Sequence, residues 1–516
     1  MQPLRRSQQL WLAVFVTAWC FLGLTGRDAW KPDEATSLTP LLDWLASGAW
    51  LPADSPFPLH TLLAGLTAWL AGTGLDLQDG ARLASGVFTL AALAFTGLAA
   101  RAFYGPGYGT AATLALMGAF GLMLRAHALL PETALMAGYA LLLYGLGLAR
   151  RHARGGLLLG LAAFALTLTR GLPDLVAAGL IVSLPLISRE WRNHAYRRAL
   201  VWATTCLVGL LAAWLGLLAW QGGAGLWGAQ FMAHAWPIAS PFWVFNNLAW
   251  FAWPIWPLAL WAVWHEHRRL KRAVELHPVL AAAAVTLAVG LWPSHSNGGA
   301  LLASLPALAL LAAHGVAHLK RGAAQAFYWF GALCFLFFAL AFWIYFSATE
   351  WGWPEKLARH MADLAPGHVG GATPAAVLWL AGAATLAWLV AMPLFPRAKA
   401  RPVLVWATGM ALSWLLLITL FRPWAEAGWS YRAQIEAMAQ HLPAGACLRV
   451  DADPAMTTML RLRLPQHYRA EGDCAWWLVG GPREDFAREA WPAETVWTGF
   501  RPRDKARYYA LIRHVP

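Results

Sequence analysis

The first apolar stretch of the chain, Leu10–Leu24 (LWLAVFVTAWCFLGL), is followed almost at once by the polar segment Gly26–Glu34 (GRDAWKPDE). The apolar stretch predicts a first membrane-spanning helix, because continuous apolar residues can cross a hydrocarbon core. Arg5 and Arg6 precede it and no small-residue cleavage site follows, which predicts a retained helix with a cytoplasmic N-terminus rather than a signal peptide. The polar segment is therefore expected just beyond the outer face of the bilayer.

The composition of the whole chain indicates a polytopic helical membrane protein. Of its 516 residues, 59% are hydrophobic and only 13% are charged, which excludes an ordinary soluble domain. A transmembrane β-barrel would show alternating rather than continuous apolar runs. The net charge of +13 comes from short basic clusters between apolar runs, which are typical topology signals and predict no nucleic-acid partner.

Apolar runs recur along the chain and predict an all-α polytopic fold of about thirteen transmembrane helices. After the first, the predicted spans are 82–100, 110–124, 133–149, 156–169, 171–187, 199–220, 246–264, 279–293, 299–317, 323–347, 374–395 and 402–421. Lys and Arg gather in every second connection, as expected if those connections are cytoplasmic. An odd number of spans then places the C-terminus outside the cytoplasm.

Two domains follow from this pattern. Residues 1–421 form the transmembrane domain, which includes a first periplasmic loop over 25–80. Within that loop, 41–45 and 59–70 have apolar residues at helical spacing and predict helices that lie in the membrane interface. Residues 422–516 have an ordinary soluble composition and predict a small periplasmic α/β domain.

In the C-terminal domain, Ser430 is expected to cap a helix that runs to about Gln440. Strands are predicted over 446–450, 475–479 and 506–512 from their β-branched and aromatic residues. Cys447 and Cys474 can form a disulfide if this domain lies outside the cytoplasm.

The tandem carboxylates Asp33 and Glu34 are the first candidates for chemistry. Ionisable side chains beside a bilayer are costly unless they are solvated or used, so they predict a functional site. Either could act as a general base that takes a proton from an acceptor hydroxyl. The alternative is a solvated acid paired with Lys31 or Arg27.

Two further charged positions lie at the outer ends of predicted spans. Glu132 follows Arg125 and could either take part in chemistry or neutralise that arginine and cap the next helix. Arg170 lies between two apolar runs and could bind a phosphate through its guanidinium fork. A structural pair with Asp174, four residues along, is the alternative.

Motifs for other chemistries are missing from the sequence. His60, His127, His234 and His295 lie in four separate outer loops without the spacing of a metal site, so the sequence assigns no metal ligand and predicts no cofactor, and it leaves dependence on a divalent metal open. The chain also contains no phosphate-binding P-loop, no dinucleotide fingerprint and no nucleophile elbow.

The first loop carries a recognisable order of residues. An outer Asp-Glu pair after the first span is followed by Gly48-Ala49-Trp50-Leu51-Pro52, then Pro58-Leu59, then Ala81-Arg82-Leu83. In this order the chain resembles the bacterial aminoarabinose transferase and protein-mannosyltransferase families, which are GT-C glycosyltransferases. The likeness extends over the whole membrane region.

The resemblance implies an inverting glycosyltransferase that uses a polyprenyl-phosphate-linked sugar and a lipid A, glycan or protein acceptor. It assigns the catalytic acid to Asp33 and a second acidic position to Glu132, with Glu34 as a neighbouring acid. It also matches a Leu-Thr-Lys-Gly motif to 168–171, where Arg170 replaces the lysine. Further candidates for holding the donor phosphate or sugar are Arg125, Lys31, Arg82, His127 and His234.

The chain departs from the family at a lysine that often precedes Pro-Pro-Leu, where this sequence has Pro56-Phe57-Pro58-Leu59. The sequence leaves two alternative functions open. A transporter or flippase of polyprenyl-linked lipids would need a similar cavity, and it would be expected to contain internal repeats. A degenerate member of the family would serve as an envelope scaffold.

Overall fold

The computed structural model describes residues 4–232, 241–269, 273–290, 299–371, 373–469, 472–484, 494–504 and 506–513. The chain forms two compact units. Unit 1 contains 1–25, 43–337 and 385–414, and unit 2 contains 26–42, 338–384 and 415–516. The predicted first loop is therefore divided, because its initial part packs with the C-terminal residues.

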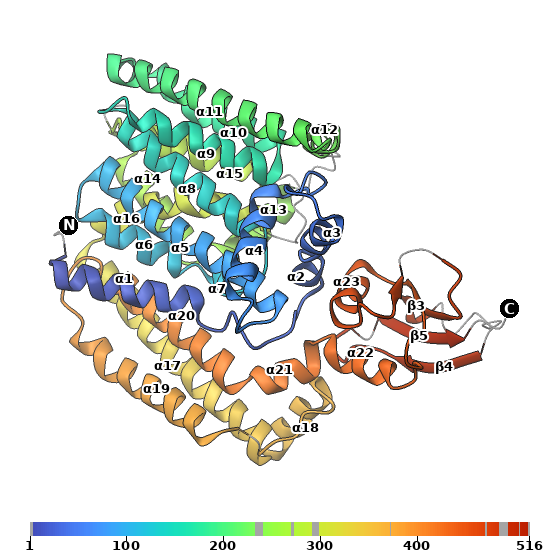
Figure 1. The fold of residues 1–516 in the computed structure, drawn as a ribbon. Helices are drawn as coiled ribbons and strands as arrows, with labels where there is room; N and C mark the ends of the chain where they lie inside the picture. Colours follow the sequence, from blue (N-terminus) through green and yellow to red (C-terminus); the bar gives the residue numbers. More distant parts are fainter. Residues whose placement is uncertain are drawn as a thin grey trace. The chain divides into compact units, whose positions relative to one another are not determined.

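Most of the described chain is helical (Figure 1). The helices up to residue 232 are α1 Arg6–Phe21, α2 Pro32–Thr36, α3 Thr39–Ser47, α4 Pro58–Ala71, α5 Leu77–Tyr104, α6 Tyr108–Met117, α7 Phe120–Arg125, α8 Glu132–Ala149, α9 Gly155–Arg170, α10 Leu172–Ser183, α11 His194–Trp220 and α12 Ala224–Met232. The later ones are α13 Pro241–Phe251, α14 Ile255–Glu266, α15 Leu276–Val289, α16 Leu305–Ala317, α17 Arg321–Trp351, α18 Glu355–Leu364, α19 Ala375–Leu394, α20 Arg401–Leu420, α21 Arg422–Trp429, α22 Arg432–Ala439 and α23 Pro454–Arg463.

Seven helical segments of the described chain are long and apolar enough to span a membrane. They are 77–104, 132–149, 194–220, 299–317, 321–351, 375–394 and 401–420. All seven coincide with predicted spans, and helices are also found at the other predicted positions. The polytopic helical fold class is confirmed, whereas the count of thirteen spans stays a prediction.

Two predicted spans are interrupted. The span over 110–124 is divided into α6 and α7 at Gly118, and the span over 246–264 is divided into α13 and α14 before Pro254. Backbone groups released by a break inside a membrane need other partners. The Phe120 N–H donates to the Trp253 carbonyl over 3.0 Å, and the Trp406 indole N–H donates to the Gly118 carbonyl over 2.8 Å.

Close helix packing in unit 1 depends on small residues. Helix α11 lies along α9, and Gly156 and Gly160 of α9 face the backbone of α11. A Cβ atom at Gly156 would overlap the carbonyl oxygen of Ala199, which is backbone and cannot rotate away. These glycines therefore set how closely the two helices approach.

Unit 2 contains a five-stranded sheet in the order β2-β1-β3-β5-β4. The strands are β1 Leu448–Asp451, β2 Tyr468–Arg469, β3 Trp476–Pro482, β4 Glu494–Gly499 and β5 Arg507–Arg513. Strand β1 pairs in parallel with β2 and β3, whereas β5 pairs antiparallel with β3 and β4. The three predicted strands are confirmed as β1, β3 and β5, and β2 and β4 were not predicted.

The core of unit 2 contains residues from both the first loop and the C-terminal segment. Buried Ala29 and Ala35 of the first loop belong to the same hydrophobic cluster as Leu448, Met459 and Leu511. The predicted disulfide between Cys447 and Cys474 is formed, and it links the residue before β1 to the approach to β3. The small C-terminal α/β fold is confirmed, and the first loop contributes to its core.

Replacing Gly156 by alanine should lower the free energy of unfolding by about 1–3 kcal/mol, because the added methyl group forces α9 away from α11. The matched control is Gly209→Ala on α11, where nothing lies within 4 Å of an added Cβ. That change should be neutral or stabilising by up to about 1 kcal/mol, since alanine favours helix over glycine. Unfolding in detergent micelles measures both, and equal stability of the two variants would contradict the packing argument.

Candidate functional site

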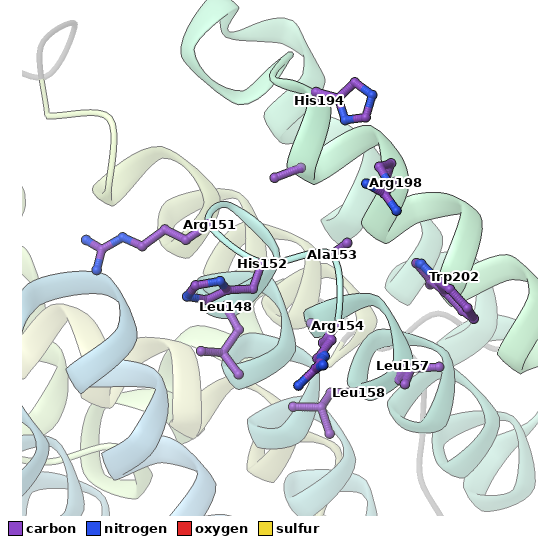
Figure 2. Close-up of a pocket in the computed structure, with 12 residues that line it drawn as sticks. Leu148, Arg151, His152, Ala153, Arg154, Leu157, Leu158, His194, Arg198 and Trp202 are labelled. Atoms are coloured by element: carbon purple, nitrogen blue, oxygen red, sulfur yellow. The ribbon is translucent and has the colours of Figure 1, made fainter.

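A pocket of about 990 Å³ opens in unit 1 between the turn after α8 and the start of α11 (Figure 2). Its lining is basic and apolar, with Arg151, Arg154 and Arg198 beside Leu157 and Trp202. None of the predicted site residues lines this pocket. The candidate chemistry must therefore be sought around the predicted residues themselves.

The tandem acids lie at the start of α2 in unit 2. Pro32 begins this helix, where its fixed φ is favourable, and acids in a first helical turn are stabilised by the helix dipole. Glu34 is buried, and the guanidinium of Arg27 donates to both of its carboxylate oxygens over 2.9 and 3.0 Å. The pairing of Glu34 with Arg27 considered from the sequence is confirmed, but the pair is buried rather than solvated.

Asp33 differs from Glu34 in its exposure. It is partly exposed, and its carboxylate accepts from the Glu34 N–H over 3.0 Å. Lys31, which precedes the helix, is exposed. Since the Glu34 carboxylate is held by Arg27, Asp33 is the acid of the tandem that remains accessible to a reactant.

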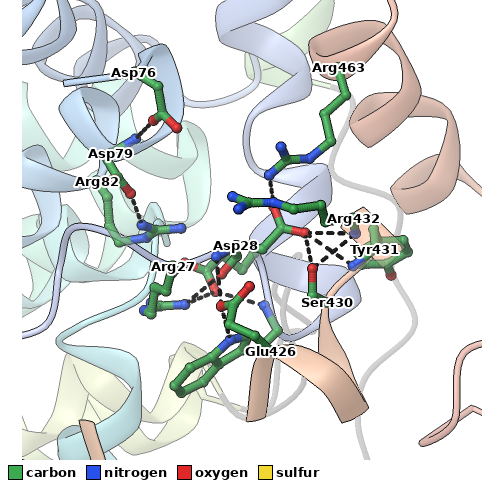
Figure 3. A network of polar contacts seen from close by, with 12 residues as sticks. Arg27, Asp28, Asp76, Asp79, Arg82, Glu426, Ser430, Tyr431, Arg432 and Arg463 are labelled. Carbon is green, nitrogen blue, oxygen red and sulfur yellow. Dashed lines mark hydrogen bonds and ion pairs between the residues drawn. The ribbon is translucent and has the colours of Figure 1, made fainter. Parts of the chain in front are cut away.

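A third acid of this segment, Asp28, makes the most contacts and was not considered from the sequence (Figure 3). It is fully buried, and one carboxylate oxygen accepts from the Ser430 hydroxyl at 2.6 Å and from the N–H groups of Tyr431 and Arg432 at 3.1 Å. Arg463 of α23 donates to the other oxygen. Asp28 thus satisfies N–H groups at the start of α22 that otherwise lack helical partners.

Glu426 of α21 completes this network. One of its carboxylate oxygens accepts from the Trp30 indole N–H over 2.7 Å and from the Asp28 N–H over 2.9 Å. Burial raises the pKa of the Glu426 carboxyl above its ordinary value, and these two hydrogen bonds oppose the rise. No local sequence signal could have found Asp28 or Glu426, because each is about four hundred residues from its partner in the chain.

In unit 1, Arg170 ends α9 and is buried. Its Nε donates to one oxygen of Asp174 over 2.6 Å, and its Nη2 lies 3.3 Å from the other. The Tyr139 hydroxyl donates to the same carboxylate over 2.5 Å. The pair with Asp174 is therefore present, while Nη1 of Arg170 has no hydrogen-bond partner within the described part of the chain.

The structure brings Glu132 close to this pair. It is buried as the first residue of α8 and interacts electrostatically with Arg170. Arg125 ends α7, is half-buried, and lies 6.0 Å from the Phe251 ring centroid. Carboxylates of Glu132 and Asp174 and the guanidinium of Arg170 thus form one charged cluster, to which helices α8, α9 and α10 contribute.

The side chains of Arg82 and His127 form hydrogen bonds within the protein. Arg82 is fully buried and donates to the Leu24 carbonyl over 2.7 Å and to Asp79 over 2.6 Å. The two ring nitrogens of His127 lie 2.6 and 2.7 Å from the carbonyl oxygens of Met123 and Trp19. His234 lies outside the described residues.

A possible metal-binding group appears elsewhere in unit 1, where ligand atoms of His265, Glu266 and His318 lie within 4.8 Å of one another. The rings of the two histidines are stacked, with centroids 4.7 Å apart and planes inclined by 27°. Lone pairs in nearly parallel rings do not converge on one ion. We assign no metal to this group.

The helices and the small sheet together define a polytopic helical fold that is shared with a solved membrane protein. The chain is similar to ArnT from Cupriavidus metallidurans, in crystal structures bound to undecaprenyl phosphate and in the apo state, each with TM-score 0.67, 18% identity and 98% of both chains covered. A further match is the archaeal oligosaccharyltransferase AglB from Archaeoglobus fulgidus, in complex with an inhibitory peptide and a dolichol-phosphate. It has TM-score 0.46 and 10% identity, and the match covers 95% of this chain and 62% of AglB.

No protein-family model matches the chain, and no curated protein matches it. The likeness to ArnT extends over nearly the full length of both chains and establishes the fold. The resemblance to the aminoarabinose transferase inferred from the sequence is thus confirmed in three dimensions.

Replacing Asp28 by alanine should loosen the start of α22, because the half-buried Arg463 loses its charged partner, the Tyr431 N–H loses its acceptor and the Arg432 N–H keeps only the Ser430 hydroxyl. We expect a loss of about 1–3 kcal/mol in local stability, seen as faster amide exchange at Tyr431 and Arg432 in the full-length protein. Asp451→Ala, at an exposed position on β1, is the matched control. Unchanged exchange in the Asp28 variant would disprove the capping role.

Proposed function

We propose that this protein is an inverting glycosyltransferase that transfers a sugar from a polyprenyl-phosphate donor to a lipid A, glycan or protein acceptor. The observation that carries the proposal is the fold shared with ArnT over 98% of both chains, since one of those ArnT structures contains undecaprenyl phosphate. The buried guanidinium of Arg170 and the partly exposed carboxylate of Asp33 support the proposal, because the sequence predicts both residues at the outer face.

The reaction is a direct displacement at the anomeric carbon. Asp33 accepts the proton of the acceptor hydroxyl, and the acceptor oxygen forms a bond to the anomeric carbon. The bond from that carbon to the phosphate oxygen breaks, and the phosphate keeps the electron pair. Nη1 of Arg170 donates to the phosphate as its charge develops, with Lys31, Arg125 and His234 as further candidate donors.

The roles of the other predicted residues follow from their contacts. Glu132 and Asp174 balance the charge of Arg170 and hold it in place. Glu34 positions the first turn of α2 through Arg27. Arg82 and His127 are proposed to act on the substrate only indirectly, because their side chains are bonded to carbonyl groups of the fold.

We place the site at the periplasmic face of a bacterial inner membrane. The disulfide between Cys447 and Cys474 is expected of a domain in an oxidising compartment. Basic clusters at alternate connections favour the cytoplasm for the opposite side. A lipid phosphate leaving group requires no nucleotide at the outer face.

Asp33→Asn should reduce transfer by a factor of about 10²–10⁴, because the general base is lost. Binding of undecaprenyl phosphate should remain within about twofold of the wild type, since that carboxylate is not proposed to hold the phosphate. Asp54→Asn, an exposed acid of the same loop, is the control and should leave turnover unchanged. Full turnover by the Asp33 variant in a membrane assay would remove the base from the mechanism.

Arg170→Gln should weaken binding of undecaprenyl phosphate by at least about tenfold, because one charge-assisted hydrogen bond to the phosphate is lost. It also leaves Asp174 buried without its cation, which costs stability. The double variant R170Q/D174N also removes the unpaired Asp174 carboxylate and should recover part of the lost stability without recovering donor binding, while Glu132 remains without its cation. Donor affinity restored in the double variant would show that Arg170 acts only as the partner of Asp174.

A further inference from the structure

The pocket between α8, α9 and α11 has the chemistry of an anion site. Arg151, Arg154 and Arg198 line it together with His152 and His194, and no acidic residue does. All three arginines are exposed, and within the described residues none has a carboxylate partner. Three unneutralised guanidinium groups around one cavity favour a multiply oxygenated anion such as phosphate.

Two helices begin at this pocket and add to its positive potential. Helix α9 starts at Gly155 and α11 starts at His194, and both residues line the cavity. Arg154 precedes α9, and in Figure 2 Arg198 and Trp202 project from α11, whereas the Arg151 side chain extends away from both Arg154 and Arg198. The N-terminal ends of helices carry partial positive charge, so they favour an anion held between them.

The remaining lining is apolar and continues onto surfaces suited to lipid. Leu157 is 45% exposed and Trp202 is 48% exposed, at the point where the basic pocket meets the sides of α9 and α11. Only 6% of the most apolar window of α11 is buried inside the protein. A ligand with a charged head and apolar chains would therefore find both of its parts matched.

This pocket is separate from the proposed donor site. Arg170 ends α9, whereas Gly155 begins it, so the two lie about 22 Å apart at 1.5 Å per residue. The pocket is thus at the end of α9 where the basic connections cluster, which is the predicted cytoplasmic side.

We propose that this pocket binds the headgroup of an anionic phospholipid. Arg154 and Arg198 hold the phosphate from opposite walls, Arg151 adds charge at the rim, and the acyl chains lie along the exposed apolar residues of α9 and α11. Arginines that serve only to set membrane topology would also lie on this side of the protein. Such arginines would require neither a cavity nor an apolar wall beside it. The inference does not depend on the proposed transferase activity.

The test is titration of the full-length protein with phosphatidylglycerol or phosphatidylcholine in detergent, with bound lipids counted by native mass spectrometry. The wild type should retain phosphatidylglycerol selectively. The variant R151Q/R154Q/R198Q should bind it on the order of a hundredfold more weakly, because each basic side chain near an anionic headgroup contributes roughly a factor of five. R154K/R198K keeps the charge but loses the fork, and an intermediate loss is expected.

The matched control is R189Q/R197Q/R268Q, which removes the same charge from exposed arginines outside the pocket lining. It should lose less than about threefold in affinity, because these side chains do not reach the cavity. Equal weakening in both triple variants, or equal retention of phosphatidylcholine, would overturn the proposal. Displacement of the lipid by inorganic phosphate at the same concentration would also overturn it, in favour of a free-anion site.

Discussion

The buried carboxylate of Asp28 is the interaction on which the order of unit 2 depends. A single side chain accepts from a hydroxyl, two backbone N–H groups and a guanidinium, all of which come from residues about four hundred positions further along the chain. Such a group is stable in a buried site only when all its hydrogen-bonding capacity is used. The position of the whole segment from Arg27 to Glu34 follows, because Glu426 holds Trp30 and the Asp28 backbone on the other side.

Unit 1 also contains a buried charged side chain with an ion-pair partner, but there the partner is only four residues away in the sequence. A guanidinium at the end of a membrane helix needs a counter-charge, and Asp174 supplies it from the first turn of the next helix, with Tyr139 as a third partner. The Arg170–Asp174 pair is close to neutral, the Glu132 carboxylate interacts with it, and Nη1 of Arg170 remains as an N–H donor. Such an arrangement holds an arginine rigidly while leaving it able to bind one anion, which suits a leaving phosphate better than a mobile lysine does.

Much of the fold could be predicted from the sequence, because long apolar runs and alternating basic connections depend on composition alone. The breaks at Gly118 and Pro254 could not, although Pro254 and Pro257 were visible signals in the second case. Strand β4 was missed despite its β-favouring Thr495-Val-Trp-Thr498, since the apolar pattern there is short. For the site, Arg27 and Asp174 were found because they are near their partners in sequence, whereas the contacts of Asp28 required the folded chain.

The division of the first loop between two units has a consequence for biosynthesis. Residues 26–42 leave the ribosome before the groups that hold them, which lie between 426 and 463. Until translation reaches Arg463, Asp28 lacks its full set of hydrogen-bond partners, and the disulfide forms only after Cys474 has followed. Maturation of the segment that carries Asp33 is therefore timed by residues made about four hundred positions later.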